Sequence, residues 1–191
     1  MALLRREAHM APCHLLDAAT GEYNVPYLHA LAKEPLSLIK GVGRTQGIIV
    51  KKGNPLGIEG VGDLVRARYV NRQRGAGTRV LLDHMLKESC IPPADINGYD
   101  REAATHMAVA ALVKSDGADA GMGILSAARA MDLGFIPVGT EEYDFAIHSD
   151  DLALSQIQLF ISVITGAEFR EALEKMGGYT FENTGKIIEV I

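Results

Sequence analysis

The 191-residue chain lacks the features that define several large protein classes. Its two cysteines, Cys13 and Cys90, form no Cys-x-x-Cys pair, so neither a disulfide framework nor a zinc site is expected. No apolar run approaches the roughly 18–20 residues that span a bilayer, and no membrane contact is expected. Charged residues at 5–7 interrupt the segment that a secretory signal would keep apolar. The chain as written is therefore expected to be cytoplasmic.

An excess of positive charge is also absent. The formal net charge is -5, which argues against a general affinity for nucleic acid, so no direct nucleic-acid contact is expected. A local anion site needs only a few donors in one place and is compatible with this charge. The hydrophobic fraction of 48% is typical of an ordinary globular protein, built as one domain or as two small lobes.

The sequence contains no recognisable catalytic set. Cys13 and His14 are adjacent, and neighbours on a strand point to opposite faces, so they cannot act as a nucleophile–base pair there. Neither a Gly-x-Ser-x-Gly elbow nor a His-Glu-x-x-His motif is present. Four other histidines stand alone and are expected on the surface or in the core: His9, His29, His84 and His148. We therefore predict a ligand-binding module with no catalytic residue, no metal and no cofactor.

Strand-like and helix-like segments alternate along the chain, which predicts an α/β fold. The expected strands are 10–16, 36–40, 47–51, 68–71, 96–99, 118–123, 135–138 and 143–147. The expected helical segments are 3–9, 27–32, 61–65, 78–89, 103–115, the stretch through Met131, 155–165 and 167–176. Gly53-Asn54-Pro55 is a strong breaker within Lys51–Gly57, a segment suited to carry the chain between two lobes.

The segment Asn71–Arg79 has the pattern of an anion-binding turn. A strand is expected to end at Asn71, glycines occupy positions 75 and 77, and a helix is expected to open at Thr78. Glycine tolerates positive φ and lets a ligand approach the backbone, and the first amides of a helix have no intrahelical partners. The candidate ligand residues of this turn are Arg72, Arg74, Gly75, Gly77, Thr78 and Arg79.

Other interpretations of the glycine-containing segments are weaker. Asn71–Arg79 lacks the spacing and the lysine of a nucleotide P-loop. The segment Gly41–Gly47 has a loose dinucleotide pattern, but a strand is expected after it where a helix is required. The alternative for Asn71–Arg79 is a tight strand–helix turn whose arginines are solvated.

Four further clusters are candidate ligand contacts, each with a structural alternative. His14, with Tyr23 nearby, lies at a strand end, or the segment is only a capped loop. Gln46 is expected between two strands, in a ligand contact or an exposed turn. Thr105 is placed to cap a helix that opens at His106, with or without a ligand. Gly121 allows close approach of a ligand, or merely helix–sheet packing.

These motifs together resemble the periplasmic-binding-protein-like domain, which is often described as a periplasmic molybdate-binding protein or domain. The resemblance covers nearly the whole chain, and its most distinctive string is Asn-Arg-Gln-Arg-Gly-Ala-Gly-Thr-Arg at 71–79. The other matching strings are Cys13–Asp17, Thr20–Asn24, Gln46-Gly47, Lys52–Pro55, Thr105-His106 and Ala118–Gly123. Members of this family are also fused to molybdopterin biosynthesis proteins or to helix-turn-helix regulators.

The resemblance implies a two-lobed type II periplasmic-binding fold, with one lobe at 1–56 plus 138–191 and the other at 57–137. It implies a small anionic ligand, molybdate- or tungstate-like or related to the molybdenum cofactor, held in the cleft between lobes. The 72–79 turn, Thr105 and His106 would face that ligand from the second lobe, and His14, Tyr23 and Gln46 from the first. Two further roles remain open: an effector domain of a transcriptional regulator, and a non-catalytic accessory domain in molybdopterin biosynthesis.

One departure from the family pattern concerns the N-terminus. Relatives carry an earlier strand and a Gly/Ser-rich loop before the helix that ends here near His9. The resemblance therefore implies a chain shortened at its start, or a start codon set too late. We expect a first lobe that lacks its first strand, a weakened site, and a sheet edge open to self-association or to a fused or associated partner domain.

Overall fold

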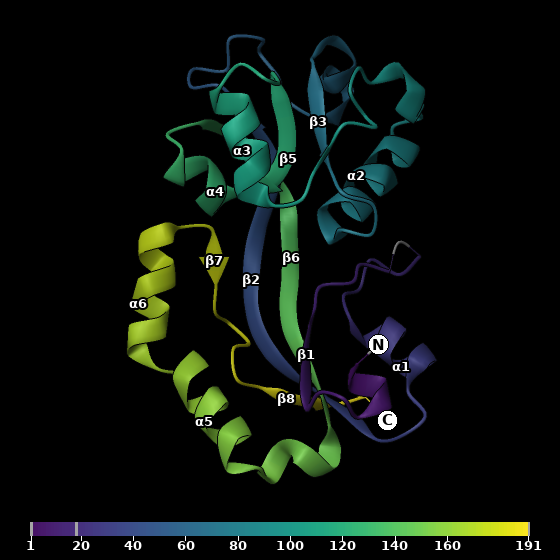
Figure 1. Ribbon diagram of the computed structural model, residues 1–191, viewed down its shortest axis with the longest axis vertical. Coiled ribbons are helices and arrows are strands. Elements are labelled where there is room, and N and C mark those ends of the chain that lie inside the picture. Colours follow the sequence, from purple (N-terminus) through teal and green to yellow (C-terminus); the bar gives the residue numbers. More distant parts are fainter. Residues whose placement is uncertain (1, 18, 191) are drawn as a thin grey trace. The chain divides into compact units, whose positions relative to one another are not determined.

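The computed structural model describes residues 2–17 and 19–190 and confirms the mixed α/β class. The chain divides into two compact units (Figure 1). Unit 1 comprises Met1–Arg44, Glu141–Lys175 and Tyr179–Ile191, and unit 2 comprises Thr45–Thr140 and Met176–Gly178.

Two long strands, β2 (Leu36–Val50) and β6 (Gly134–His148), pass from one unit into the other. The expectation that each of them forms two shorter strands with a turn between is wrong. The glycines of β2 explain the continuity. A Cβ on Gly41 would lie 2.0 Å from the Tyr143 carbonyl oxygen, and a Cβ on Gly47 would lie 2.3 Å from that of Ile136. Glycine at these positions therefore permits close strand pairing and does not mark a turn.

Unit 2 contains a sheet in the order β6-β2-β5-β3-β4, to which β6 contributes its first residues. Its other strands are β3 (Tyr69–Arg72), β4 (Glu102–Ala103) and β5 (Ala120–Ile124), and its α-helices are α2 (Gly77–Glu88), α3 (His106–Lys114) and α4 (Leu125–Ala130). Two 3₁₀ turns complete the unit, at Val61–Arg66 and Pro93–Asp95. β3 is parallel to both β4 and β5, whereas β2 is antiparallel to β5.

The helices of unit 2 cover opposite faces of its sheet (Figure 1). One core packs Leu82 and Leu86 of α2 against Ile48 and Met122. The other core packs Val109 and Val113 of α3 with Ala127 of α4 on the opposite face. A sheet covered on both sides explains why β3 and β5 are buried along almost their whole length.

Segment 96–99 is not a strand, contrary to the expectation. Gly98 has a φ of 93°, and a Cβ there would lie 2.2 Å from the Tyr69 carbonyl oxygen, so the chain turns closely over β3 at this point. On the side of β3 away from β5, the pairing strand is the short β4 that follows this segment. Its register joins Asn71 to Glu102 and Arg72 to Ala103.

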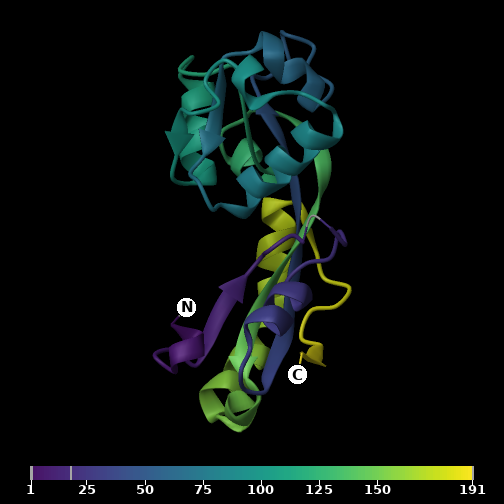
Figure 2. The same ribbon diagram turned by 90° about the vertical axis from the view of Figure 1, so that its right-hand side faces the viewer.

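Unit 1 contains the sheet order β1-β6-β2 (Figure 2). Its other elements are β1 (Met10–Cys13), α1 (Val25–Leu31), α5 (Ser155–Ile164), α6 (Ala167–Met176, whose last residue is counted with unit 2), β7 (Tyr179–Thr180), β8 (Ile187–Glu189), and 3₁₀ turns at Leu3–Arg5 and Ser149–Ala153. The two expected C-terminal helices are confirmed. β7 and β8, which both pair with β2, were not expected.

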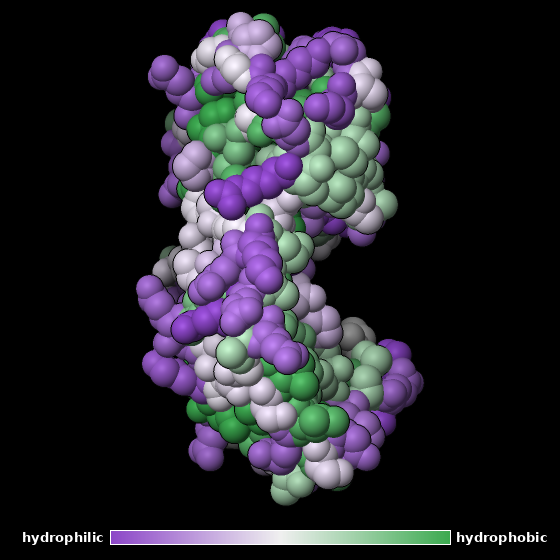
Figure 3. Space-filling model, turned by 90° about the vertical axis from the view of Figure 1, so that its left-hand side faces the viewer, coloured by the Kyte–Doolittle hydropathy of each residue, from purple (hydrophilic) through white to green (hydrophobic). Residues whose placement is uncertain are grey.

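Apolar side chains remain exposed on α5. Leu159 is 65% exposed and Val163 is 54% exposed, one helical turn apart. Figure 3 shows hydrophobic areas among polar side chains on the face of unit 1 that carries α5 and α6. Within residues 2–17 and 19–190, no helix has the length and apolar character needed to cross a membrane.

Candidate functional site

Several predicted site residues of unit 2 meet at one edge of its sheet. The parallel strands β3, β4 and β5 end at this edge and lead into α2, α3 and α4 respectively. The antiparallel register of β2 pairs Gln46 with Ile124, which places Gln46 at the same edge. Ligands of open α/β sheets bind outside the carboxyl ends of the strands, where helices depart to opposite faces.

The first turn of α2 has unsatisfied backbone donors. The residue before the helix is Ala76, which offers no capping side chain. In the described part of the chain, the backbone amides of Gly77 and Thr78 have no hydrogen-bond partner. Gly75 precedes them with a φ of 83°, a conformation that favours glycine. These amides lie at the positive end of the helix dipole and are suited to an anion.

The side chain of Gln46 lies beside this helix start. The Thr78 hydroxyl donates a hydrogen bond of 3.2 Å to Gln46 Oε1, and both residues are almost completely buried. Gln46 Nε2 is buried and has no hydrogen-bond partner among the described residues. An orphaned buried amide is costly for the fold and calls for an explanation such as a ligand. Gln46 Nε2 and the two backbone amides are therefore uncharged donors that remain unused at this end of the sheet.

Arg72 is held inside the protein rather than presented to solvent. Its guanidinium donates to the carbonyl oxygens of Ala103 at 3.3 Å and Ala104 at 3.0 Å. Its Nη1 lies 2.9 Å from His106 Nδ1, and because arginine can only donate, this imidazole nitrogen accepts. Arg72 thus ties the end of β3 to the segment that opens α3, and it supplies positive charge from behind this edge of the sheet.

The other two arginines of the turn have different environments. Arg79 is buried, donates to Glu102 Oε1 at 2.5 Å, and lies 4.8 Å from the centre of the Tyr99 ring. The Arg74 side chain is 80% exposed, 3.7 Å from Asp100 and 3.8 Å from Glu102. Arg79 therefore stabilises the turn. Arg74 is solvated, as expected for a tight strand–helix turn that binds no ligand through this side chain.

Thr105 and Gly121 have structural roles that the structure makes explicit. The Thr105 hydroxyl accepts a 3.0 Å hydrogen bond from the Ala108 amide, which confirms the expected cap of α3. A Cβ on Gly121 would lie 2.5 Å from Val109 Cγ1 and 2.8 Å from the Val70 carbonyl oxygen. Gly121 therefore permits close packing of α3 on the sheet, which is the structural one of the two roles expected for it.

His14 and Tyr23 belong to unit 1, where both lie near the buried Glu141, a residue not among the predicted site residues. His14 stacks on Tyr143 with ring centres 5.5 Å apart, and its Nδ1 lies 3.6 Å from Glu141 Oε2. Arg44 forms an ion pair with Glu141 and lies 4.2 Å above the Tyr143 ring. Burial, together with the nearby acidic residues of β6, raises the pKa of Tyr23 to about 12.

Glu141 could have been suspected from the sequence. Acids at positions 141, 142 and 144 fall in and beside a segment with strand character, and a carboxylate buried in a strand requires partners. Asp144 is the second such case. It accepts hydrogen bonds from Lys40 at 2.6 Å, from Asn24 Nδ2 at 2.8 Å and from the Gly41 amide at 3.0 Å. This network fixes the loop that carries Tyr23 to the sheet of unit 1.

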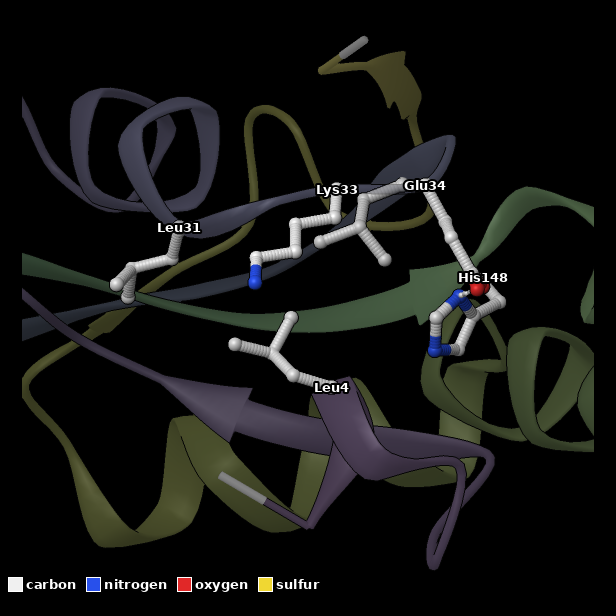
Figure 4. A pocket seen from close by; sticks show the side chains of 6 residues that line it. Leu4, Leu31, Lys33, Glu34 and His148 are labelled. Carbon is white, nitrogen blue, oxygen red and sulfur yellow. Dashed lines mark ion pairs between the residues drawn. The ribbon is translucent and has the colours of Figure 1, made fainter.

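A cavity of about 350 Å³ lies at the end of unit 1 where β6 finishes (Figure 4). It is lined by Leu4, Leu31, Lys33, Glu34, Leu36 and His148. Glu34 accepts a 2.6 Å hydrogen bond from Arg6 and lies 3.5 Å from His148 Nδ1. His148 Nε2 lies 2.9 Å from the Leu3 carbonyl oxygen. The charge of the Glu34 carboxylate is thus already compensated by Arg6 and His148, and we assign no ligand to this cavity.

Comparison with known proteins identifies the family to which this chain belongs. Residues 1–165 match the PBP superfamily domain. The chain belongs to the PBP superfamily. Domains of this superfamily are generally binding domains and not enzymes, which agrees with the expected binding module.

Similarity to individual proteins is of two kinds. The uncharacterized protein YvgK of Bacillus subtilis is 40% identical over 178 residues, which is 92% of this chain and 57% of YvgK. The chain therefore spans little more than half of that relative. Campylobacter jejuni PEB3 with bound L-phospholactate has a TM-score of 0.51 at 20% identity, covering 74% of this chain and 67% of PEB3. The effector-binding domain of QuiR in complex with shikimate has a TM-score of 0.57 at 16% identity, covering 78% and 66%.

Proposed function

We propose that this PBP-superfamily domain binds a small tetrahedral oxyanion of the molybdate or tungstate type at the start of α2. The observation that carries the proposal is the orphaned Nε2 of buried Gln46, next to a helix start whose first amides are also unpaired. An oxyanion has several acceptor oxygens and could satisfy these donors together.

The donors around this site suit a dianion without a direct ion pair. The amides of Gly77 and Thr78 and Gln46 Nε2 are uncharged. Both buried cations of the turn are already bonded, Arg72 to carbonyl oxygens and Arg79 to Glu102. Preorganised neutral donors and a helix dipole can offset the desolvation of an anion. Gly121, Arg72 and Arg79 then act by shaping or supporting the site.

Isothermal titration calorimetry with molybdate, tungstate, sulfate and phosphate tests the proposal. We expect binding of one anion per chain, and we expect Thr78→Val to weaken it by about 10-fold, because Gln46 loses the hydroxyl that holds its amide in place. Thr180→Val, which removes an exposed hydroxyl in β7, is the matched control and should bind like the unaltered protein. Absence of heat and of a thermal shift with all four anions at millimolar concentration would rule the proposal out.

A second candidate is the effector domain of a regulator. It is supported by the likeness to the QuiR effector-binding domain and by the length of YvgK, of which this chain covers 57%. In that case the ligand is an organic acid, and a carboxylate takes the place of the oxyanion at the α2 start. Calorimetry with shikimate beside the inorganic anions separates the two candidates, and an open reading frame upstream that encodes a DNA-binding segment would favour the regulator.

A role as a non-catalytic accessory domain in molybdopterin biosynthesis is the third candidate. It uses the same oxyanion-binding chemistry and adds a partner enzyme. It therefore predicts molybdate binding by the isolated chain, together with association with a molybdopterin-synthesising protein in a pull-down experiment. Molybdate binding without such association would leave the sensing role.

A further inference from the structure

Unit 1 contains a further cavity, of about 220 Å³, between its sheet and helix α6. Strands β2, β6 and β7 supply one wall, and the end of α5 and one side of α6 supply the other. The lining residues are Gly41, Val42, Arg44, Tyr143, Phe145, Ile164, Phe169, Leu173 and Tyr179. No residue of the α2 start belongs to this cavity.

The lining favours a flat aromatic guest. Tyr143 and Phe145 meet edge to face with ring centres 5.7 Å apart, and Phe145 meets Phe160 in the same way at 4.7 Å. His14 and Arg44 already lie against the Tyr143 ring, so a guest ring would pack mainly against Phe145 and Phe169 of the lining. An apolar cavity of roughly 150 Å³ is known to hold benzene, so 220 Å³ accommodates one ring with a small substituent.

The Arg44 guanidinium in the lining determines which polar substituent the guest ring can carry. The Arg44 side chain is 15% exposed, its guanidinium lies over the Tyr143 ring, and its Nε is buried without a hydrogen-bond partner in the described residues. Glu141, 2% exposed at its side chain, already neutralises the charge of Arg44. A carboxylate on the guest would be repelled by Glu141 in this poorly solvated place, whereas a neutral oxygen could accept from Arg44.

We propose that this cavity binds a small neutral one-ring compound that carries a carbonyl or hydroxyl oxygen. The ring packs mainly against Phe145 and Phe169, and the oxygen accepts a hydrogen bond from Arg44. The site is separate from the oxyanion site and does not depend on it.

Ligand-observed NMR and thermal-shift titration with benzamide, benzoate and benzylamine test the chemical class. These three compounds share one ring and differ in charge. Benzamide is expected to bind with a dissociation constant of about 1 mM or lower, and benzoate and benzylamine at least about tenfold more weakly. Tighter binding of benzoate than of benzamide would overturn the neutral assignment, and no binding of benzamide at about 10 mM would overturn the site.

Two variants locate the binding. Leu173→Trp fills the cavity and should weaken benzamide binding at least about tenfold, whereas Leu159→Trp, on the exposed face of α5, should leave it unchanged. Arg44→Lys retains the positive charge but removes the Nε donor, and should weaken benzamide by about fivefold or more. Unchanged benzamide binding in both a folded Leu173→Trp protein and a folded Arg44→Lys protein would place the compound elsewhere and refute the proposal.

Molybdate titration of the Leu173→Trp protein separates this proposal from the function proposed above. Loss of benzamide binding with intact molybdate binding supports two independent sites. Intact benzamide binding in a protein that binds no oxyanion leaves the present proposal standing when the first one fails.

Discussion

The Thr78 hydroxyl donates a hydrogen bond to Gln46 Oε1, 3.2 Å away, and the Nε2 of the same amide is buried with no partner among the residues that the structure describes. These two residues are 32 positions apart in the chain. They meet because α2 begins at the end of β3 while antiparallel β2 brings Gln46 to the same edge of the sheet. If this pair serves the fold, replacing it should lower the free energy of unfolding. If it serves a ligand, replacing it should weaken anion binding instead.

The double variant Gln46→Leu/Thr78→Val should separate stability from binding. Replacing both members of a buried polar pair by apolar groups of similar size is nearly neutral or stabilising, so we expect the free energy of unfolding to change by less than about 1 kcal/mol. Anion binding should weaken by at least about 10-fold. Urea unfolding and calorimetry measure the two quantities, and a loss of more than about 2 kcal/mol of stability would mean that the pair serves the fold.

Arg72 and Arg74 should respond very differently to the same substitution. Arg72→Met removes the guanidinium donors of the Ala103 and Ala104 carbonyl oxygens, of which only that of Ala103 keeps the Gln73 amide, and should cost about 2 kcal/mol or more of unfolding free energy. Arg74→Met, at an 80% exposed side chain, should change it by no more than about 0.5 kcal/mol. Equal effects of the two substitutions in urea unfolding would contradict the structural role given to Arg72.

Gly121→Ala tests whether this glycine is required for packing. The added Cβ would lie 2.5 Å from Val109 Cγ1 and 2.8 Å from the Val70 carbonyl oxygen, so we expect a loss of about 1–3 kcal/mol. Gly139→Ala in β6 is the matched control, because a Cβ there meets nothing within 4 Å and its φ is not positive. That substitution should be neutral or slightly stabilising. A stable Gly121→Ala protein would show that α3 can move away from the sheet without cost.

The two cysteines should differ in reactivity. Cys13 is buried, and burial, with the nearby Asp144 carboxylate, raises the pKa of its thiol to about 12. At pH 8 only about one Cys13 in 10,000 is therefore a thiolate, whereas Cys90 is exposed. Ellman's reagent should label one thiol per native chain and two per unfolded chain. Rapid labelling of both thiols in the native protein would contradict the burial of Cys13.

The raised pKa of Cys13 also has a consequence for stability at alkaline pH. Because the folded state favours the thiol form, its contribution to stability is complete below the unfolded-state pKa near 9 and declines as the pH rises towards about 12. Cys13→Ala should therefore lose less stability than the unaltered protein between pH 9 and pH 11. Guanidinium unfolding across this range measures the difference, and parallel curves would contradict the expectation.

Local signals in the sequence were sufficient for most helices and for the anion turn. Thr105 followed by an apolar-periodic run predicts the start of α3, and the glycine at 75 predicts a turn with positive φ before α2. The amphipathic segments 155–165 and 167–176 predict α5 and α6. These features depend on residues within one or two turns of each other, so neighbouring sequence carries the necessary information.

The strands and the roles of the arginines required the tertiary structure. Gly41 and Gly47 suggest a turn when β2 is considered alone, and only the backbone of β6 beside them shows why they lack a Cβ. In the same way, only the tertiary structure shows that Arg72 donates to the carbonyl oxygens of Ala103 and Ala104. The sequence by itself determined the PBP-type α/β pattern and the helix start at Thr78. Tertiary structure decided that Gln46 meets Thr78, because hydrogen bonding between residues so distant in the chain depends on strand register and not on local conformational preference.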